Sequence, residues 1–294
     1  MLRPIRNTYV LVYNYFTNYS TTNLFRWFFF WKYAILVKTN RKGRYFLALC
    51  RRRYYGILTL YTFDSRVRFS ETNANKQLRL TSMINYFQDC SSFQSEQIGA
   101  GFSFLEQRHR AWIISSWQLE VIRFPFFNER ITIGTWPTEF KGMFGNRNYV
   151  LLDETGETLA AAHSIWVYLD TATLRPTRIL PEDSAPYIDY IQPPYPMQIE
   201  GRKILIPDTF TEKEPIPVTA AHLDTNRHVN NGQYISMAES CLPNDFIPHK
   251  MRVEYRKSAV LGNIIYPRVT VNTNSCTIVL SDSLGTPYAV VTFK

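Results

Sequence analysis

The chain has 294 residues, of which 45% are hydrophobic and 19% are charged, with a formal net charge of +9. This length allows one large domain or two ordinary ones with a sizeable core. Residues 1–60 hold 11 Lys and Arg and no Asp or Glu, whereas the remainder holds 22 basic and 24 acidic residues. The body of the protein is therefore close to neutral, which argues against a nucleic-acid partner.

The segment 1–60 differs from the rest of the chain and holds 16 of its 45 aromatic residues. Its apolar run, 24–37, is shorter than the roughly 20 residues of a membrane span and carries two cations, so no stable membrane insertion is expected. Signal-peptide and serine-rich transit-peptide patterns are not clear in it. A targeting or membrane-surface segment stays open, as does an upstream region read from a start site assigned too early and not part of the native fold.

The four cysteines, Cys50, Cys90, Cys241 and Cys276, lie far apart and form no CxxC or Cys/His metal spacing. Scattered thiols in a chain of this length favour a reducing compartment over a disulfide scaffold. We therefore expect ordinary cysteines, no metal site and no cofactor.

From residue 61 onward the chain repeats one pattern of elements. The stretch 80–93 has apolar residues at the spacing of a helix with one buried face, namely Leu80, Met83, Ile84, Phe87 and Cys90. Strands are predicted at 111–123, 130–136, 148–153 and 158–170, with a hairpin turn at 153–156.

The second copy keeps this order. A strand at 216–223 is predicted to precede a helix at about 229–241, and strands follow at 250–257, 264–273, 276–281 and 288–293. Six prolines lie between the copies and favour an extended crossover: Pro176, Pro181, Pro186, Pro193, Pro194 and Pro196. A helix followed by antiparallel strands, given twice, predicts an α+β protein whose sheets each wrap a central helix.

One run of polar residues, Asp224-Thr-Asn226-Arg-His228, falls between the strand and the helix of the second copy. A carboxylate beside an imidazole can deprotonate water and later protonate a leaving thiolate. The helix start at Asn230 and Asn231 offers backbone N–H groups to a carbonyl oxyanion. The cluster therefore predicts a hydrolytic site, although each residue alone is also compatible with a turn, a helix cap or a structural histidine.

Residues 61–294 resemble the acyl-[acyl carrier protein] thioesterases, the double hotdog enzymes of bacteria and plant plastids. The resemblance rests on the segments 83–89, 136–142, 145–148, 166–170, 224–231 and 254–257, which read MINYFQD, WPTEFKG, GNRN, WVYLD, DTNRHVNN and EYRK. It implies a tandem hotdog fold: an acyl-binding hotdog at 61–172, a proline-rich linker at 173–204 and a catalytic hotdog at 205–294.

The same resemblance implies that the protein hydrolyses fatty acyl-carrier-protein thioesters with Asp224, Asn226 and His228 as catalytic residues. Plant members carry Glu and Cys after the motif that ends at Lys257, whereas Ser258 and Ala259 stand there in this chain. Serine can hydrogen-bond a water but is not a base near neutral pH. Asp224 as sole carboxylate, a substitute acid and a low rate all stay open.

The family's carrier protein is acidic, so we expect it to dock on cations near the site, with Arg252, Arg256 and Lys257 as weak candidates. Candidates for an acyl tunnel are Met83, Phe87, Trp117, Phe124, Phe126, Phe127, Trp136 and Phe140. We expect a bacterial cytoplasmic protein, or a plastid one if 1–60 is a genuine transit segment, and a homodimer stays open. An acyl-CoA thioesterase, a hotdog hydratase and a non-catalytic acyl-binding module are the alternative functions.

Overall fold

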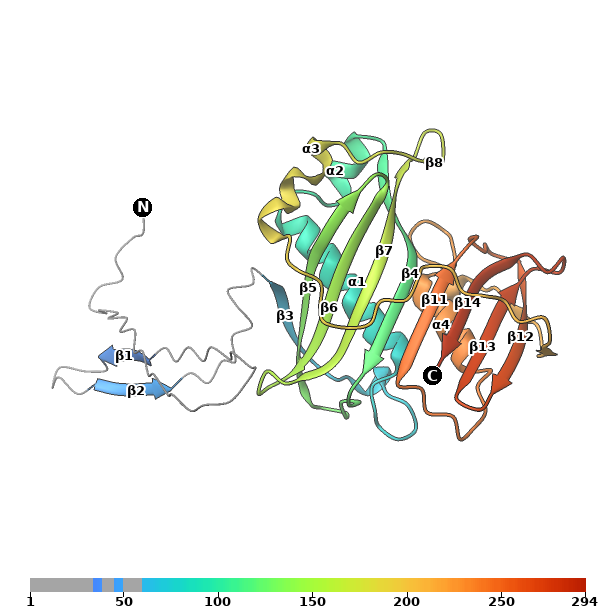
Figure 1. Ribbon diagram of the computed structural model, residues 1–294, viewed down its shortest axis with the longest axis horizontal. Coiled ribbons are helices and arrows are strands. Elements are labelled where there is room, and N and C mark those ends of the chain that lie inside the picture. Colours follow the sequence, from blue (N-terminus) through green and yellow to red (C-terminus); the bar gives the residue numbers. More distant parts are fainter. Residues whose placement is uncertain (1–33, 39–44, 50–59) are drawn as a thin grey trace, which may run out of the picture. The chain divides into compact units, whose positions relative to one another are not determined.

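The computed structural model describes residues 34–38, 45–49 and 60–294 (Figure 1). The chain divides into two compact units, Met1–Ile57 and Leu58–Lys294. In the first unit, β1 (Ala34–Lys38) pairs antiparallel with β2 (Tyr45–Leu49). The other predictions made for residues 1–60 lie outside the described residues.

The second unit is built on one antiparallel sheet of 12 strands in the order β10-β12-β13-β14-β11-β4-β7-β6-β5-β3, with β8 beside β7 and β9 beside β12. The two halves of the sheet meet where β4 pairs with β11, with Trp117 opposite Val253. The strands are β3 (Tyr61–Arg66), β4 (Arg110–Val121), β5 (Arg130–Lys141), β6 (Phe144–Asp153), β7 (Thr158–Asp170), β8 (Arg175–Pro176), β9 (Thr211–Glu212), β10 (Ile216–Pro217), β11 (Lys250–Tyr255), β12 (Ile264–Asn272), β13 (Ser275–Ser281) and β14 (Pro287–Phe293).

The two longest helices, α1 (Leu80–Gln97) and α4 (Asn231–Glu239), lie on the same face of this sheet (Figure 1). α1 packs on β5 and β6, α4 packs on β13 and β14, and the two helices contact each other. Shorter helical elements are α2 (Phe102–Gln107), α3 (Pro181–Ser184), and the 3₁₀ turns η1 (Phe69–Glu71), η2 (Ala185–Tyr190) and η3 (Ala220–His222). Among the described residues, no helix combines the length and hydropathy that crossing a membrane requires.

The apolar stripe predicted for the first helix is confirmed, since all five of its residues are buried in the core between α1 and the sheet. Phe87 packs against two further aromatic rings, its centroid 5.3 Å from that of Tyr149 and 6.4 Å from that of Trp117. Burial raises the pKa of the Cys90 thiol to about 12, and Cys241 and Cys276 are buried as well. These three cysteines therefore fit the prediction of ordinary core thiols.

Two sequence predictions need correction. The strand expected at 216–223 ends at Pro217, and η3 follows, because the N–H groups of His222 and Leu223 bond to the local carbonyls of Thr219 and Ala220. The linker is not extended throughout: α3 begins at Pro181 and η2 includes Pro186. Proline is compatible with the first turn of a helix, where its missing N–H has no intrahelical partner.

The segment 192–204, named the strap here, crosses the sheet face opposite α1 and α4 (Figure 1). The Trp136 indole N–H donates to the Pro193 carbonyl at 3.0 Å. The Glu200 N–H donates to the Gln118 side chain on β4 at 2.9 Å, and the Ile204 N–H donates to Glu254 on β11 at 2.9 Å. The strap therefore bridges the two halves of the sheet where they meet.

Where α1 and α4 contact each other, a carboxylate from α4 lies at the start of α1. Arg79 gives α1 no side-chain cap, but the Glu239 carboxylate at the end of α4 accepts a 2.8 Å bond from Thr81 Oγ1 and backbone bonds from Leu80 and Thr81. Its burial outweighs these bonds and raises the pKa of Glu239 above the usual value.

We expect Glu239→Gln to gain stability relative to the wild type as pH rises. A carboxyl whose pKa is raised on folding favours the folded state fully below its unfolded pKa, and this contribution is lost as pH rises through the folded pKa. Urea unfolding of both proteins from pH 4.5 to pH 8 measures the effect. A stability difference that does not change with pH would contradict it.

Candidate active site

The polar run 224–228 forms a tight turn that Asp224 holds together. Its Oδ1 accepts the N–H of Asn226 at 2.8 Å and that of His228 at 3.2 Å, and the Asp224 N–H donates to the His228 carbonyl at 2.8 Å. Arg227 adopts a φ of 59°, in the left-handed region that a tight turn of this kind uses. Asp224 and His228 therefore meet through the backbone, and not through a direct bond between carboxylate and imidazole.

The helix α4 begins where the sequence predicts. Asn230 is its N-cap, and its side chain accepts the Gly232 N–H at 2.8 Å. The Gln233 N–H bonds to the Asn230 carbonyl, so neither of these bonds uses the N–H of Asn231. The amide side chain of Asn230 is therefore occupied by the cap, and Asn231 carries the N–H group that can face a ligand.

Ser258 lies close to the turn because the two residues that follow it, Ala259 and Val260, make backbone contacts there. His228 forms an isolated bridge with Val260, and the Val229 N–H donates to the Ala259 carbonyl at 2.9 Å. Ser258 is exposed, as are Asn226 and His228.

These residues line one cavity of about 940 Å³. All six predicted catalytic, supporting and helix-start residues border it: Asp224, Asn226, His228, Asn230, Asn231 and Ser258. The other walls come from the first half of the unit and include Gln88 and Ser91 from α1 and Trp112 from β4. The site is therefore shared between the two halves.

The aromatic candidates for the acyl tunnel are mostly elsewhere. Of those eight residues Phe140 lines the cavity, whereas Phe87 and Trp117 are fully packed in the core and Phe126 is half exposed. The residues that provide apolar wall instead include Ile114 and Trp166. Local sequence does not show which face of a strand meets a cavity formed with a distant helix.

A buried cation borders the cavity and was not singled out by sequence reasoning. Arg147 on β6 is 7% exposed. Its Nη1 donates to Gln94 Oε1 and, at 3.3 Å, to Thr135 Oγ1. Its guanidinium also lies 5.6 Å from the centre of the Tyr187 ring. The cavity wall is therefore mixed, with apolar residues such as Ile114 and Trp166 beside charged and polar ones such as Arg147.

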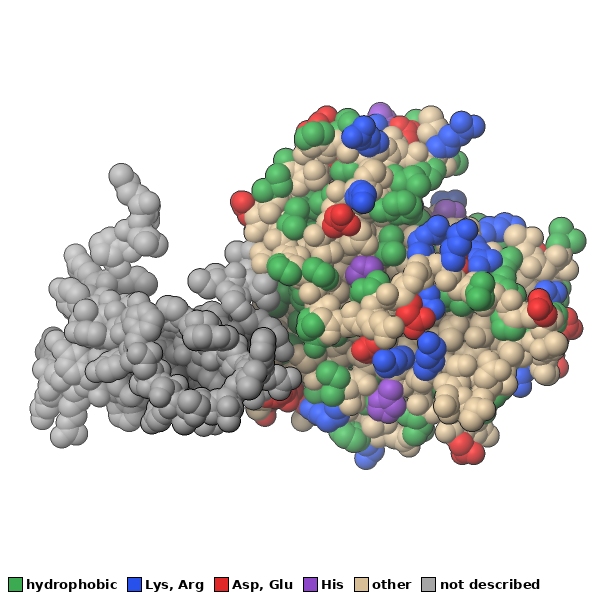
Figure 2. Space-filling model, viewed as in Figure 1, with side chains coloured by type: hydrophobic (Ala, Val, Ile, Leu, Met, Phe, Trp, Pro, Cys, Tyr) green, Lys and Arg blue, Asp and Glu red, His purple; other side chains and the backbone are tan. Residues whose placement is uncertain are grey.

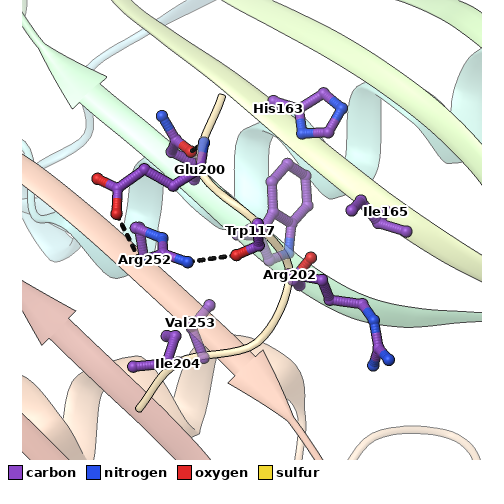
Figure 3. Close-up of a pocket in the computed structure, with 11 residues that line it drawn as sticks. Trp117, His163, Ile165, Glu200, Arg202, Ile204, Arg252 and Val253 are labelled. Carbon is purple, nitrogen blue, oxygen red and sulfur yellow. Dashed lines mark hydrogen bonds and ion pairs between the residues drawn. The ribbon is translucent and has the colours of Figure 1, made fainter. Parts of the chain in front are cut away.

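The three cations proposed for carrier docking are already paired. Arg252 lies beneath the strap, with Nη1 2.6 Å from a Glu200 oxygen and Nη2 bonded to the Gly201 carbonyl (Figure 3). Arg256 pairs with Glu254 at 2.8 Å, and Lys257 pairs with Asp282 at 3.2 Å. Lys and Arg side chains do gather on this face of the molecule (Figure 2). Docking at these residues stays a prediction, and Arg252 and Arg256 have a structural role.

The first half of the unit contains a turn of the same geometry between η1 and α1. Asn73 Oδ1 accepts the N–H groups of Asn75 at 2.9 Å and Gln77 at 3.0 Å, and the Asn73 N–H donates to the Gln77 carbonyl at 2.8 Å. Lys76 has a φ of 60°, as Arg227 has 59°. This turn holds Asn and Gln where the second has Asp224 and His228, so the second turn alone carries the titratable pair. The two turns are 151 residues apart in the sequence.

Solved structures of other proteins identify the fold of this chain. An acyl-ACP thioesterase from Bacteroides thetaiotaomicron superposes with a TM-score of 0.73 at 18% identity, covering 80% of this chain and 96% of that one. A 12:0-ACP thioesterase from Umbellularia californica gives 0.72 at 18% identity with the same coverage. The chain therefore has a hotdog fold.

The sequence identifies the family. Residues 59–187 match the acyl-ACP thioesterase N-terminal domain, and residues 207–288 match the acyl-ACP thioesterase C-terminal domain. The chain belongs to the acyl-ACP thioesterase family.

Curated relatives agree with this assignment. A chloroplastic acyl-[acyl-carrier-protein] hydrolase of Cuphea viscosissima is 24% identical over 213 residues, which cover 68% of this chain and 52% of that protein. The chloroplastic oleoyl-acyl carrier protein thioesterase 2 of Arabidopsis thaliana is 25% identical over 219 residues, which cover 68% of this chain and 59% of that protein. The chain thus spans somewhat more than half the length of these relatives.

Proposed function

We propose that this protein hydrolyses the thioester between a fatty acyl group and an acyl carrier protein, releasing free fatty acid. The observation that carries the proposal is the single cavity bordered by Asp224, Asn226, His228 and Ser258 at one end and by side chains of the first half elsewhere. Membership of the acyl-ACP thioesterase family supports the same activity. We propose with it a tandem hotdog organisation, with an acyl-binding part at 61–172, a linker at 173–204 and a catalytic part at 205–294.

In the proposed reaction a water oxygen attacks the thioester carbonyl carbon while Asp224 takes the water proton. Asp224 Oδ1 is occupied by two backbone N–H groups, whereas Oδ2 accepts no hydrogen bond from the described part of the chain. The carbonyl oxygen becomes an oxyanion near the Asn231 N–H, where a donor stabilises the transition state. The intermediate then collapses, the C–S bond breaks, and the proton passes to the thiolate sulfur, giving acid and thiol.

Asn226 and His228 are proposed to orient the water and the carbonyl. Asp224 fixes both residues because its carboxylate binds their N–H groups. Ser258 can hydrogen-bond the water but cannot act as a base. Other carboxylates that border the cavity are Glu96 and Glu106. Asp224 is favoured as the acting base because it is the carboxylate on the same turn as Asn226 and His228, whose N–H groups it binds, whereas Glu96 accepts the Phe102 N–H at 2.8 Å.

The carrier protein is the proposed macromolecular partner. A homodimer is not needed to complete the cavity, whose described walls come from one chain. The expected location, a bacterial cytoplasm or a plastid, stays a prediction, and the relatives named above are chloroplastic proteins.

A thiol-release assay tests the proposal. The full chain is given acyl-carrier protein, acyl-CoA and enoyl-CoA side by side, and we expect thiol release with the highest kcat/KM on acyl-carrier protein. Hydration of enoyl-CoA without thiol release would identify a hydratase. Tight acyl binding without release would identify a binding module.

A further inference from the structure

One side chain of the first half reaches the start of the candidate catalytic helix. Gln88, on α1, accepts a hydrogen bond at 3.5 Å from the Asn231 side-chain amide, and both residues border the cavity. Asn231 is also held from its own half, because the Tyr255 hydroxyl donates to its carbonyl at 2.9 Å. Gln88 and Tyr255 thus fix the first residue of α4 from opposite halves of the unit.

The first turn of α4 lies close to α1 along this side. A Cβ at Gly232 would lie 2.6 Å from Asn85 Oδ1 and 3.3 Å from Thr81 Cγ2, nearer than ordinary packing allows. Glycine at this position lets the helix start approach α1. That approach brings Gln88 within reach of Asn231.

The same contact occurs a second time with the halves exchanged. Glu239 follows Gln88 by 151 residues, as Asn231 follows Leu80. Glu239 binds the start of α1 through the backbone of Leu80 and Thr81 and through Thr81 Oγ1. Each helix therefore sends an amide or carboxyl side chain to the first turn of the other.

The two contacts differ in the charge of the side chain and in which N–H groups at the helix start remain without a partner among the described residues. At α1 the Glu239 oxygens take the N–H groups of the first turn. At α4 the Gln88 side chain binds the amide side chain of Asn231, and its own Nε2 donates to no residue in the described part of the chain. The start of α4 therefore keeps the Asn231 N–H for a ligand, and Gln88 adds a neutral amide donor beside it.

We propose that Gln88 is a further catalytic residue, whose side-chain N–H donates to the thioester carbonyl oxygen as it becomes the oxyanion. This inference rests on the proposed function. In the first half of the reaction the carbonyl π electrons move to oxygen as water adds to carbon, and the Gln88 N–H stabilises that negative charge without transferring a proton. A glutamate there would place a second carboxylate against the oxyanion, in the cavity that Asp224 also borders.

The test compares Gln88→Glu, Gln88→Met and the wild type on acyl-carrier protein. Gln88→Glu keeps the oxygen that binds Asn231 and loses the N–H, so we expect kcat to fall about 10²–10³-fold at pH 8 with KM little changed. Gln88→Met loses both the oxygen and the N–H, so its kcat should fall at least as far. Gln97→Glu, an exposed change at the end of the same helix at a residue that does not line the cavity, is the matched control and should keep the wild-type kcat.

The pH profile distinguishes a hydrogen-bond donor role of residue 88 from a role in packing alone. A glutamate at 88 regains an O–H donor when protonated, so the activity of Gln88→Glu relative to wild type should rise as pH falls. The ionisable side chains that share its cavity are Asp224, His228, Glu96, Glu106, His109, Arg110, Arg147 and Tyr187, and the ratio to wild type removes their own titration. A Gln88→Glu enzyme with wild-type kcat at pH 8, or a loss seen only in KM or in stability, overturns the inference. A wild type that releases no thiol would instead refute the proposed function.

Discussion

Replacing Asp224 with Asn is expected to lower kcat on acyl-carrier protein by about 10²–10⁴-fold, the usual contribution of a general base. KM and the free energy of unfolding should stay close to wild type. The amide oxygen of Asn can still accept the N–H groups of Asn226 and His228, so the turn is retained while the base is lost. Steady-state thiol release and urea unfolding measure the two effects.

The matched control for this variant is Asp153→Asn in the hairpin between β6 and β7. Asp153 Oδ1 binds the N–H groups of Thr155 at 2.9 Å and Glu157 at 3.0 Å, the same arrangement at a site remote from the cavity. Asp153→Asn should therefore leave kcat unchanged. Equal kcat values for Asp224→Asn and wild type would contradict the role given to Asp224.

Replacing Phe87 with Ala is expected to reduce the free energy of unfolding by about 3–5 kcal/mol, because it removes a fully buried ring from a packed core. Phe87 is 0% exposed and contacts Trp117 and Tyr149, which belong to β4 and β6. The loss is a large share of the roughly 5–15 kcal/mol typical of a folded protein. Equilibrium urea unfolding checks it.

Phe93, on the same helix, is the control for this second prediction. It is 47% exposed and contacts Phe63 edge-on at 5.4 Å between ring centroids. We expect Phe93→Ala to cost about 1 kcal/mol. Similar losses for the two variants would mean that the packing of α1 against the sheet is not the main source of stability.

The order of the elements was predictable because their signals are local. The apolar stripe of α1 has helical spacing, and the strands β4, β6, β7 and β11–β14 differ from their predicted ranges by a few residues at most. The Asn230 cap also lies where it was expected. The correction at 218–223 also has a local cause, since short-range hydrogen bonds there replace strand pairing.

The turn was also predictable from the chain itself. Asp224, Asn226 and His228 are two residues apart, and a turn before a helix brings such side chains to one place. Their grouping at one cavity matches that expectation. A turn role for Asp224 was among the alternatives that the sequence left open, but the particular N–H groups that its oxygen accepts depend on backbone geometry.

The sequence by itself determined the helices, the strands and the polar turn, since each depends on residues within a few positions of one another. Only the tertiary structure decided which side chains complete the cavity. Gln88 and Asn231 are 143 positions apart, and Arg252 meets Glu200 across 52. Such contacts arise from the way two helices share one face of a sheet and a strap crosses the other. No local pattern of residues records that arrangement.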